Sequence, residues 1–257
     1  MNFLAVDIGN TMTDLGFFHG GKLIRTIRIP TGKCRTAAGI LKLFPSNVQK
    51  RMRDMPVGYA SVVPSVERVF IGAMLRITGR MPLAIGPNSP LGFKAKYRPL
   101  SSLGRDRLAA ASGAVELKGT PVIIVDFGTA ITVDAVSRKG VFLGGAIAPG
   151  PGLSAAALAR GTARLPLSRL TRPHRAIGRS TKECLSSGIV IGLASLADGL
   201  VARITREMGE KTVPVLATGG AARLIAPFSK TMRRVIPGLV LSGIRVVAQR
   251  TAREKRV

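Results

Sequence analysis

The chain has 257 residues, and 39 Lys plus Arg against 13 Asp plus Glu give it a formal net charge of +26. Hydrophobic residues make up 46% of the chain and charged residues 20%, which supports a packed core and argues against intrinsic disorder. The two cysteines and two histidines are widely separated, so the sequence offers little basis for a zinc site, a disulfide or a histidine-dependent nucleophile.

The first half of the chain begins with β-rich sequence. Apolar and β-branched residues at 2–7, 12–18 and 22–29 predict three strands in succession, interrupted by His-Gly-Gly at 19–21. We expect next a helix over 36–44, a basic linker, a strand over 58–64 and a helix over 65–78. Residues 100–117 predict a loop followed by an Ala-rich helix from Leu108 on, with Asp106 in the position of an N-cap.

The second half repeats this order. Its expected elements are a strand at 121–126, a hairpin through Gly128 and Gly140, a small-residue helix at 153–160, a long helix from Thr181 to Met208, a strand at 213–217, a turn at 218–220 and a last helix. Because the pattern restarts, we expect two α/β domains, residues 1–116 and 117–257, with a ligand cleft between them.

The clearest motif is a repeated one, DIGNTMTD at 7–14 and DFGTAITVD at 126–134. Superposing Asp7 on Asp126 also superposes Gly9 on Gly128 and Thr13 on Thr132. A glycine turn lets the backbone approach a phosphate, Thr and Asn side chains donate hydrogen bonds, and a carboxylate at a strand end can hold a cation. The repeat therefore favours phosphate binding over the alternative of two ordinary β-hairpins.

Two other glycine-rich stretches are excluded as nucleotide motifs. The stretch from Gly16 to Lys22 has the spacing of a Walker loop, but Leu23 stands where Ser or Thr should bind magnesium. GPGLSA at 150–155 resembles a dinucleotide fingerprint, but Pro151 stiffens the turn and no acidic residue follows about 20 residues later.

The positive charge leaves two interpretations open. An excess of this size attracts nucleic acid or any polyanion by counterion release. The basic residues are nevertheless spread along the chain, and with no Trp and two Tyr there is no aromatic platform for single strands. A solvated basic surface with non-specific attraction is the alternative to a nucleic-acid function.

We expect a cytoplasmic protein without a membrane span, because no continuous apolar run has the necessary length and the start of the chain does not resemble a signal peptide. The helix at 189–204 is rich in Ala, Gly and Ser, which favours close packing against a second subunit. Burial within one subunit is the alternative.

Seven motifs occur in the order and spacing of type III pantothenate kinase, which the chain resembles over nearly its whole length. They are DIGNTMTD, GRDR at 104–107, DFGTAITVD, GGAIAPG, TARLP at 162–166, GRSTKECLSSGI at 178–189 and TGGAA at 218–222. The resemblance implies an α/β fold of two ribonuclease H-like domains, as in the acetate and sugar kinase, Hsp70 and actin superfamily. It also implies ATP-dependent phosphorylation of pantothenate, the first step of coenzyme A biosynthesis, by a homodimer that uses Mg²⁺ and K⁺ or NH₄⁺.

The resemblance further implies the site residues. Asp106 would be the general base, kept ionised by Arg105 and Arg107, while Asp126 would bind K⁺ and Asp7 would organise Mg²⁺ through the phosphates. The implied ATP-binding residues are Asp7, Ile8, Gly9, Asn10, Thr11, Met12, Thr13, Asp14 and Thr129. The implied pantothenate-binding residues are Tyr97, Gly104, Arg105, Asp106, Arg107 and, from the partner subunit, Thr181.

The chain departs from the family pattern beside the implied pantothenate pocket. Arg98 stands where Asn is frequent before Pro99, and Leu108 replaces an aromatic residue after the GRDR motif. One branch of the family has been described as a transcription accessory factor, so a nucleic-acid-binding factor of the same family is the alternative function.

Overall fold

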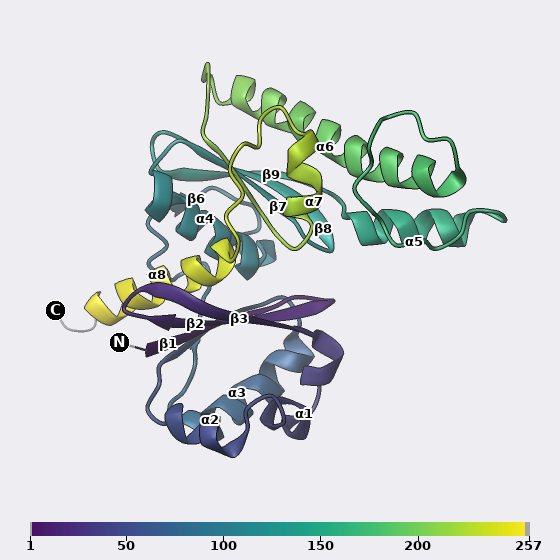
Figure 1. The fold of residues 1–257 in the computed structure, drawn as a ribbon. Helices are drawn as coiled ribbons and strands as arrows, with labels where there is room; N and C mark the ends of the chain where they lie inside the picture. Colours follow the sequence, from purple (N-terminus) through teal and green to yellow (C-terminus); the bar gives the residue numbers. More distant parts are fainter. Residues whose placement is uncertain (1, 255–257) are drawn as a thin grey trace. The chain divides into compact units, whose positions relative to one another are not determined.

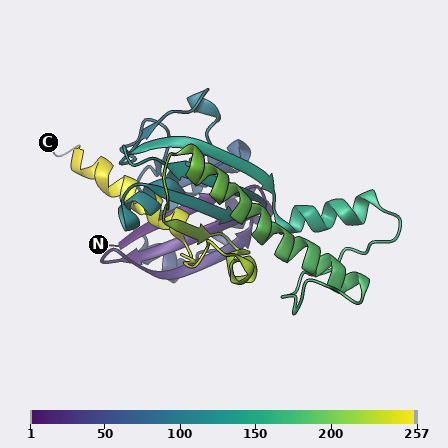
Figure 2. The ribbon, with the colours of Figure 1, turned by 90° about the horizontal axis from the view of Figure 1, so that it is seen from above.

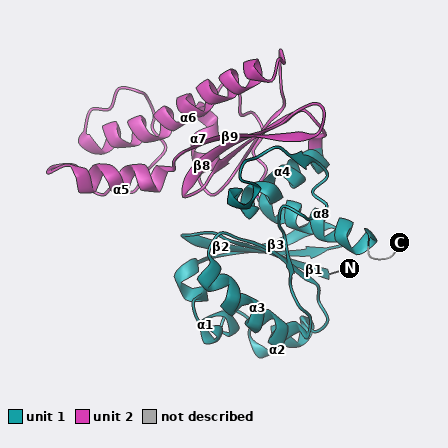
Figure 3. Ribbon diagram, turned by 180° about the vertical axis from the view of Figure 1, so that it is seen from behind, with its two compact units in different colours: residues 1–117, 238–257 teal, residues 118–237 magenta. Residues whose placement is uncertain are grey.

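The chain folds into two compact units, each built around its own β-sheet (Figures 1 and 3). This computed structural model describes residues 2–254. Unit 1 contains the described residues up to Leu117 and those from Gly238 on, and unit 2 contains Lys118–Pro237. The sequence places the last helix in the second domain, whereas the structure returns it to unit 1, because it packs on two strands of that unit's sheet.

The sheet of unit 1 has the strand order β3-β2-β1-β4-β5. Its strands are β1 (Asn2–Ile8), β2 (Met12–His19), β3 (Lys22–Pro30), β4 (Val57–Ser61) and β5 (Leu83–Ala84). The first three are antiparallel neighbours, and β4 and β5 continue the sheet in parallel with β1. The carboxyl ends of β1 and β4 therefore meet at one edge, where the turn after β1 lies.

Helices cover both faces of this sheet (Figure 3). They are α1 (Ala37–Leu41), α2 (Ser46–Arg51), α3 (Pro64–Thr78), α4 (Arg105–Lys118) and α8 (Leu239–Glu254); short segments are η1 (Thr31–Cys34), β6 (Lys94–Ala95) and η2 (Leu100–Ser102). Alternate residues of β1, namely Leu4, Val6 and Ile8, are buried in a core with α1 to α3. The opposite face meets α8, on which α4 packs.

One expected helix is shorter than the sequence predicts, and a second helix lies where a linker is expected. The sequence predicts a single helix over 36–44, but α1 ends at Leu41 and α2 begins at Ser46. Pro45 separates them, because a proline disfavours helical backbone at the residue before it and is well suited to begin the next helix.

Unit 2 repeats the arrangement of unit 1. Its strands β7 (Val122–Phe127), β8 (Ala130–Val136) and β9 (Val141–Pro149) form an antiparallel meander, and β10 (Val215–Thr218) lies parallel to β7. The helical segments are α5 (Pro151–Gly161), α6 (Thr181–Glu207), α7 (Ala222–Ile225) and η3 (Ala226–Phe228). Three antiparallel strands followed by a parallel strand on the far side of the first form the ribonuclease H-like topology, so both units have the fold that the sequence predicts.

Helix α6 is the longest helix among the described residues and lies beside α5 (Figures 1 and 2). Contrary to our expectation, its length and apolar composition are sufficient for a membrane span. Its charged residues lie near the two ends of the helix, apart from Asp198 in its interior. Its buried residues, which include Val190, Ala194 and Ala197, pack in the core of unit 2. This packing is that of a core helix, so the length of α6 is weak evidence for a membrane span.

Helices α4 and α8 of unit 1 approach each other closely through glycines. A Cβ atom on Gly243 would collide with the backbone carbonyl of Ala109, and one on Gly113 would lie 2.7 Å from the carbonyl oxygen of Leu239. Because these neighbours are backbone atoms, no rotamer change relieves the collision.

We predict that Gly243→Ala destabilises the protein by about 1–3 kcal/mol, because the two helices must move apart. Gly72→Ala is the matched control, since Gly72 lies inside α3 with open space around its Cβ position. That change should stabilise by about 0.5–1 kcal/mol through helix propensity. Chemical denaturation of both variants provides the measurement, and equal stability of the two would contradict the packing described.

Asp198 of α6 holds the loop that follows η3. Its carboxylate accepts hydrogen bonds from the hydroxyls of Ser229 and Thr231, both at 2.6 Å, and from the backbone N–H groups of Lys230 and Thr231. Burial alone would raise the pKa of Asp198, but these hydrogen bonds outweigh it and lower the pKa.

A lowered pKa in the folded state means that this stabilisation is present above the unfolded-state pKa of about 3.9 and is lost as the pH falls through the folded value. We therefore expect Asp198→Asn to be less stable than the wild type at neutral pH, with the difference shrinking below about pH 4. Urea denaturation across pH measures it. Glu207→Gln, at the exposed end of the same helix, should differ little from the wild type throughout. A stability difference for Asp198→Asn that does not change with pH would refute this explanation.

Candidate active site

The first candidate phosphate turn joins β1 to β2. Asp7 pairs with Asp14 and Ile8 pairs with Thr13, and the N–H of Gly9 donates to the carbonyl of Met12 at 3.0 Å. Directly paired residues share a face of the sheet, so both carboxylates lie on the α8 face. Asn10 and Thr11 at the turn are exposed, whereas Ile8 is fully buried and can contribute only backbone atoms to a ligand site.

Asp14 is neutralised within its own sheet. The guanidinium of Arg28 on β3 donates to both of its carboxylate oxygens, at 2.9 and 3.0 Å. Burial raises the pKa of Asp14, and Arg28 opposes that rise. Because two carboxylates facing each other across a strand pair repel, the Arg28 pairing lets Asp14 stay beside Asp7.

Thr13 does not lie where the resemblance implies. Its side chain is 1% exposed and points to the α1 to α3 face, away from Asp7, where its hydroxyl lies 3.0 Å from that of Thr31. A buried hydroxyl on that face supports the turn from within, so the expectation that the Thr13 side chain lines the phosphates needs correction.

The second candidate turn, between β7 and β8, is one residue shorter than the first. Asp126 pairs with Thr132, six positions later, whereas Asp7 pairs with a residue seven positions later. Thr132 is thus the structural counterpart of Asp14, and the superposition of Thr13 on Thr132 is off by one. The carboxylate at the strand end and the following glycine do correspond in both turns.

Two glycines far along the chain pack on this second turn. Gly219 has φ of +95°, and a Cβ there would collide with the carboxylate of Asp126 and the backbone of Phe127. A Cβ on Gly150 would collide with the carbonyls of Gly128 and Thr129, and the Gly150 N–H donates to Thr129. The TGG turn at 218–220 therefore touches the Asp126 carboxylate, as needed if both serve one ligand.

The donor set suits a cation held mainly by a ligand's own oxygens. Among the described residues, no group of three His, Cys, Asp or Glu side chains gathers as a metal cage. Each turn instead offers a strand-end carboxylate beside close-packed backbone. Mg²⁺ in kinases is commonly held by one or two carboxylates together with phosphates and water, so Asp7 and Asp126 fit such a role.

Asp106 is the second residue of α4, inside the helix, which corrects the expected N-cap position. Its carboxylate accepts a hydrogen bond from the N–H of Arg107 at 2.8 Å and lies against the Cα of Gly104, where a Cβ would collide with it. Burial raises the pKa of Asp106, and the hydrogen bond and charge of Arg107 partly offset the rise. A carboxylate with a raised pKa at a helix start is suited to accept a proton.

The two arginines beside Asp106 have different partners. Arg105 donates to Glu67 of α3 at 2.8 Å, and Tyr59 donates to the same oxygen at 3.0 Å. Burial, followed by the Glu67 contact, raises the pKa of Tyr59 to about 12. The expectation that Arg105 helps to keep Asp106 ionised is therefore wrong, because its guanidinium is directed to Glu67.

Arg107 lies next to the aromatic residue implied for the pantothenate site. Its guanidinium carbon is 5.4 Å from the ring centroid of Tyr97, and its Nη1 is 3.4 Å from the Tyr97 hydroxyl. The structure thus brings Tyr97, Gly104, Asp106 and Arg107 together in unit 1. Leu108, where the resemblance implies that an aromatic residue is common, is fully buried and belongs to the core.

Thr181, the remaining residue implied for the pantothenate site, is the exposed first residue of α6 in unit 2. Ser180 caps the helix, accepting from the N–H of Glu183 at 3.3 Å, while the Glu183 carboxylate accepts from the N–H of Arg179 at 2.8 Å. This reciprocal capping fixes the chain direction just before Thr181.

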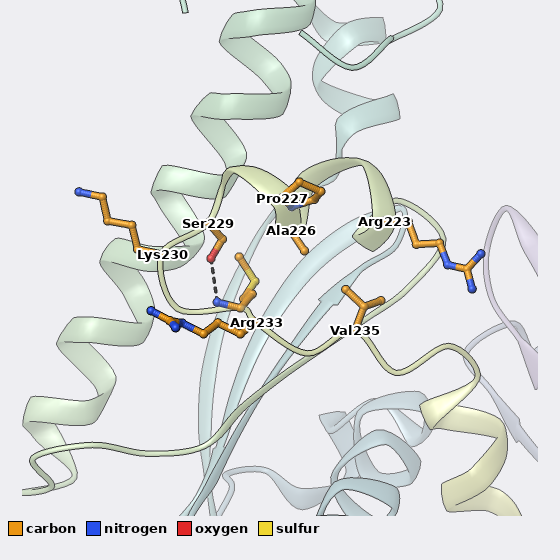
Figure 4. A pocket seen from close by; sticks show the side chains of 8 residues that line it. Arg223, Ala226, Pro227, Ser229, Lys230, Arg233 and Val235 are labelled. Atoms are coloured by element: carbon orange, nitrogen blue, oxygen red, sulfur yellow. Dashed lines mark hydrogen bonds between the residues drawn. The ribbon is translucent and has the colours of Figure 1, made fainter. Parts of the chain in front are cut away.

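A wide hollow of about 860 Å³ lies in unit 2 just after the TGG turn (Figure 4). The apolar residues Ala226, Pro227, Met232 and Val235 line it. Arg223 extends on one side of it, and Lys230 and Arg233 extend on the other. Apolar lining with cations at the rim suits a flat ring carrying an anionic substituent.

Two residues near these sites, Thr31 and Glu67, were not identified from the sequence, whereas Gly150 and Gly219 lie in the GGAIAPG and TGGAA motifs but were given no individual role. For Gly150 and Gly219, the glycine pairs at 144–145 and 219–220 and the Pro-Gly steps at 149–152 were a sequence indication of close backbone approach. No sequence pattern indicated Thr31 or Glu67, because their contacts are made across 22 and 38 residues.

Solved structures share this fold. A Baf family transcriptional activator from Campylobacter jejuni superposes with a TM-score of 0.63 at 19% identity, covering 97% of this chain and 99% of the other. A ROK family glucokinase from Streptomyces griseus gives a TM-score of 0.56 at 13% identity, with 97% and 100% coverage. At these identities the likeness concerns the fold alone, and it confirms the predicted fold.

Sequence comparison identifies the family. The family model described as type III pantothenate kinase matches residues 3–203. A type III pantothenate kinase of Moorella thermoacetica is 39% identical over 251 residues, and one of Geobacter sulfurreducens is 40% identical over 252 residues; both alignments cover 96% of this chain and 98% of the relative. The chain therefore belongs to the type III pantothenate kinase family.

Proposed function

We propose that the protein transfers the γ-phosphoryl group of ATP to the terminal hydroxyl of pantothenate, giving 4'-phosphopantothenate for coenzyme A synthesis. The observation that carries this proposal is the intact Asp106 of the GRDR segment, set into the start of α4 beside Tyr97 and Arg107, in a chain that belongs to this kinase family.

The residues of this chain would contribute mainly by positioning, as phosphoryl transfer requires. Backbone and side-chain donors of Asn10 and Thr11 would bind phosphate oxygens at the first turn, where Gly9 allows close approach of the backbone, and Thr129 would bind them at the second. The nucleoside end of ATP would lie beside the TGG turn and the hollow that contains Arg223. Asp106 would accept the proton of the pantothenate hydroxyl as the new oxygen–phosphorus bond forms.

Cations would be needed to offset phosphate charge. Asp7 would organise Mg²⁺ through water or the phosphates, and Asp126 would bind K⁺ or NH₄⁺ with neighbouring backbone oxygens. Bound Mg²⁺ supplies charge neutralisation on the β- and γ-phosphates. The support for these assignments is the carboxylate near the strand end in each turn.

A homodimer would complete the pantothenate site, with Thr181 supplied by the partner subunit. One face of α6 is buried in unit 2, while its opposite face presents Gly188, Gly192, Ser195 and Gly199 to solvent. The nearby side chains of Leu153, Leu167 and Ile177 are also exposed. The buried face of α6 fits the interpretation of burial within one subunit, and the exposed face fits packing against a second subunit.

A cytoplasmic location would suit such a metabolic enzyme. The alternative, a nucleic-acid-binding factor of the same family, is not favoured, because the relatives that align over nearly the whole chain are named as kinases. The likeness to a transcriptional activator is one of fold only. The charge of +26 then represents a basic surface with non-specific attraction for polyanions.

The deciding experiment measures ADP formation and phosphopantothenate by mass spectrometry in the presence of pantothenate, ATP, Mg²⁺ and either K⁺ or NH₄⁺. We expect turnover by the wild type and a loss of about 10²–10⁴-fold in kcat for Asp106→Asn, with ATP binding retained. Well-folded wild-type protein that is inactive with every phosphoryl donor and cation tried would refute the proposed activity. A near-normal rate for Asp106→Asn would refute only the assignment of the base.

Glu67 should control the charge around Asp106. In Glu67→Gln, Arg105 loses its anionic partner, so its guanidinium is free to approach Asp106 and, together with Arg107, lower the pKa of that carboxyl. We expect the acid limb of the pH profile of kcat/KM to move to lower pH. Glu116→Gln is the matched control, because Glu116 pairs with Arg250 at the opposite end of the same helix α4. An acid limb that coincides in the two variants would show that Arg105 stays away from Asp106.

A further inference from the structure

Thr31, the first residue of η1, lies directly beneath the first phosphate turn. Its hydroxyl donates to the carbonyl of Gly9 at 2.7 Å, and its backbone N–H donates to the carbonyl of Thr11 at 2.9 Å. The side chain is 3% exposed. One residue thus binds the turn between Gly9 and Thr11 at both ends, from a segment about twenty positions further along the chain.

The hydroxyl of Thr13 completes a directed chain of hydrogen bonds. A threonine hydroxyl has one proton, and that of Thr31 is used on Gly9. The 3.0 Å contact between the two hydroxyls therefore has Thr13 as donor and Thr31 as acceptor. The chain runs from Thr13 through Thr31 to the Gly9 carbonyl. Both hydroxyls are buried and the Gly9 end is half-buried, so the bonds lie where they can polarise one another.

We propose that Thr31 is a positioning residue that holds the first turn in the shape that binds phosphate. This assignment rests on the proposed function in one respect, namely that the first turn is the phosphate site. With the Gly9 and Thr11 carbonyls drawn inward to Thr31, these two carbonyl groups are directed away from an incoming phosphate. Carbonyl oxygens would repel phosphate, so their inward direction favours anion binding.

Thr31→Val removes the hydroxyl while keeping the branched shape and the backbone N–H. The half-buried Gly9 carbonyl then loses the hydroxyl that donates to it, whereas the Thr13 hydroxyl keeps its hydrogen bond with the Cys34 thiol. We expect KM for ATP to rise about 5- to 30-fold with a smaller change in kcat, as for lost binding that is equal in the ground and transition states. Thr31→Ser keeps the hydroxyl and should lie within about twofold of the wild type.

The matched control is Thr36→Val, five residues further on. Thr36 caps α1 by accepting from the N–H of Gly39 and is exposed, so its loss affects stability without touching the turn. Two measurements that need no turnover accompany the kinetics: affinity for a non-hydrolysable ATP analogue by calorimetry, and hydrogen exchange of the amides of Gly9 and Thr31. We expect both to change in Thr31→Val and neither to change in Thr36→Val.

Unchanged analogue affinity and unchanged amide exchange in folded Thr31→Val would overturn the proposal. If Thr31→Val does not fold, the comparison passes to Thr13→Val, which removes the upstream donor and should weaken analogue binding in the same direction; unaltered binding there would also overturn it. A wild type that binds the analogue but does not phosphorylate pantothenate would refute the proposed function alone. A wild type that binds no nucleotide would refute both.

Discussion

Each sheet of this protein ends a central strand in a carboxylate and then reverses the chain within a few residues. This constraint determines much of what surrounds it. A tight turn exposes backbone N–H groups at the sheet edge, but it also leaves carbonyls that need partners and a charge that needs compensation. The neighbouring elements supply these in each unit, and the half-buried Asp7 and Asp126 lie at the edge of their sheets.

The two units support their turns in different ways, unit 1 with side chains and unit 2 with backbone. In unit 1, the turn is held by the hydroxyls of Thr13 and Thr31, and Arg28 balances the extra carboxylate of Asp14. In unit 2, the shorter turn is held by backbone at Gly150 and Gly219, which approach too closely for any other residue. A side-chain support can be tuned by single substitutions, whereas a backbone support tolerates almost none. The duplicated fold therefore has one adjustable turn and one rigid turn.

Much of the fold followed from local pattern, because strand alternation and helical spacing are properties of neighbouring residues. The β1–β2–β3 and β7–β8–β9 meanders, α3 and α6 lie close to their expected positions. The strand-end carboxylates and the GRDR segment were likewise visible as motifs. The one-residue difference between the turns was not, since DIGNT and DFGTA align without a gap and only the strand pairing reveals the shift. Contacts that join distant segments, such as Arg105 with Glu67, leave no trace in a single sequence.

The return of α8 to unit 1 has a consequence for synthesis of the protein on the ribosome. Residues of β1 and β4 are made early, yet the helix that packs on them is made only after the whole of unit 2. Unit 2 is one continuous segment and has all of its parts once Pro237 has left the exit tunnel. One face of the sheet of unit 1 stays uncovered until α8 has been made, and that face carries the apolar contacts of Phe3 and Ile244 around Gly58. The nascent chain thus exposes a sheet surface for the time needed to translate the second unit, a period in which a chaperone would have a physical reason to bind it.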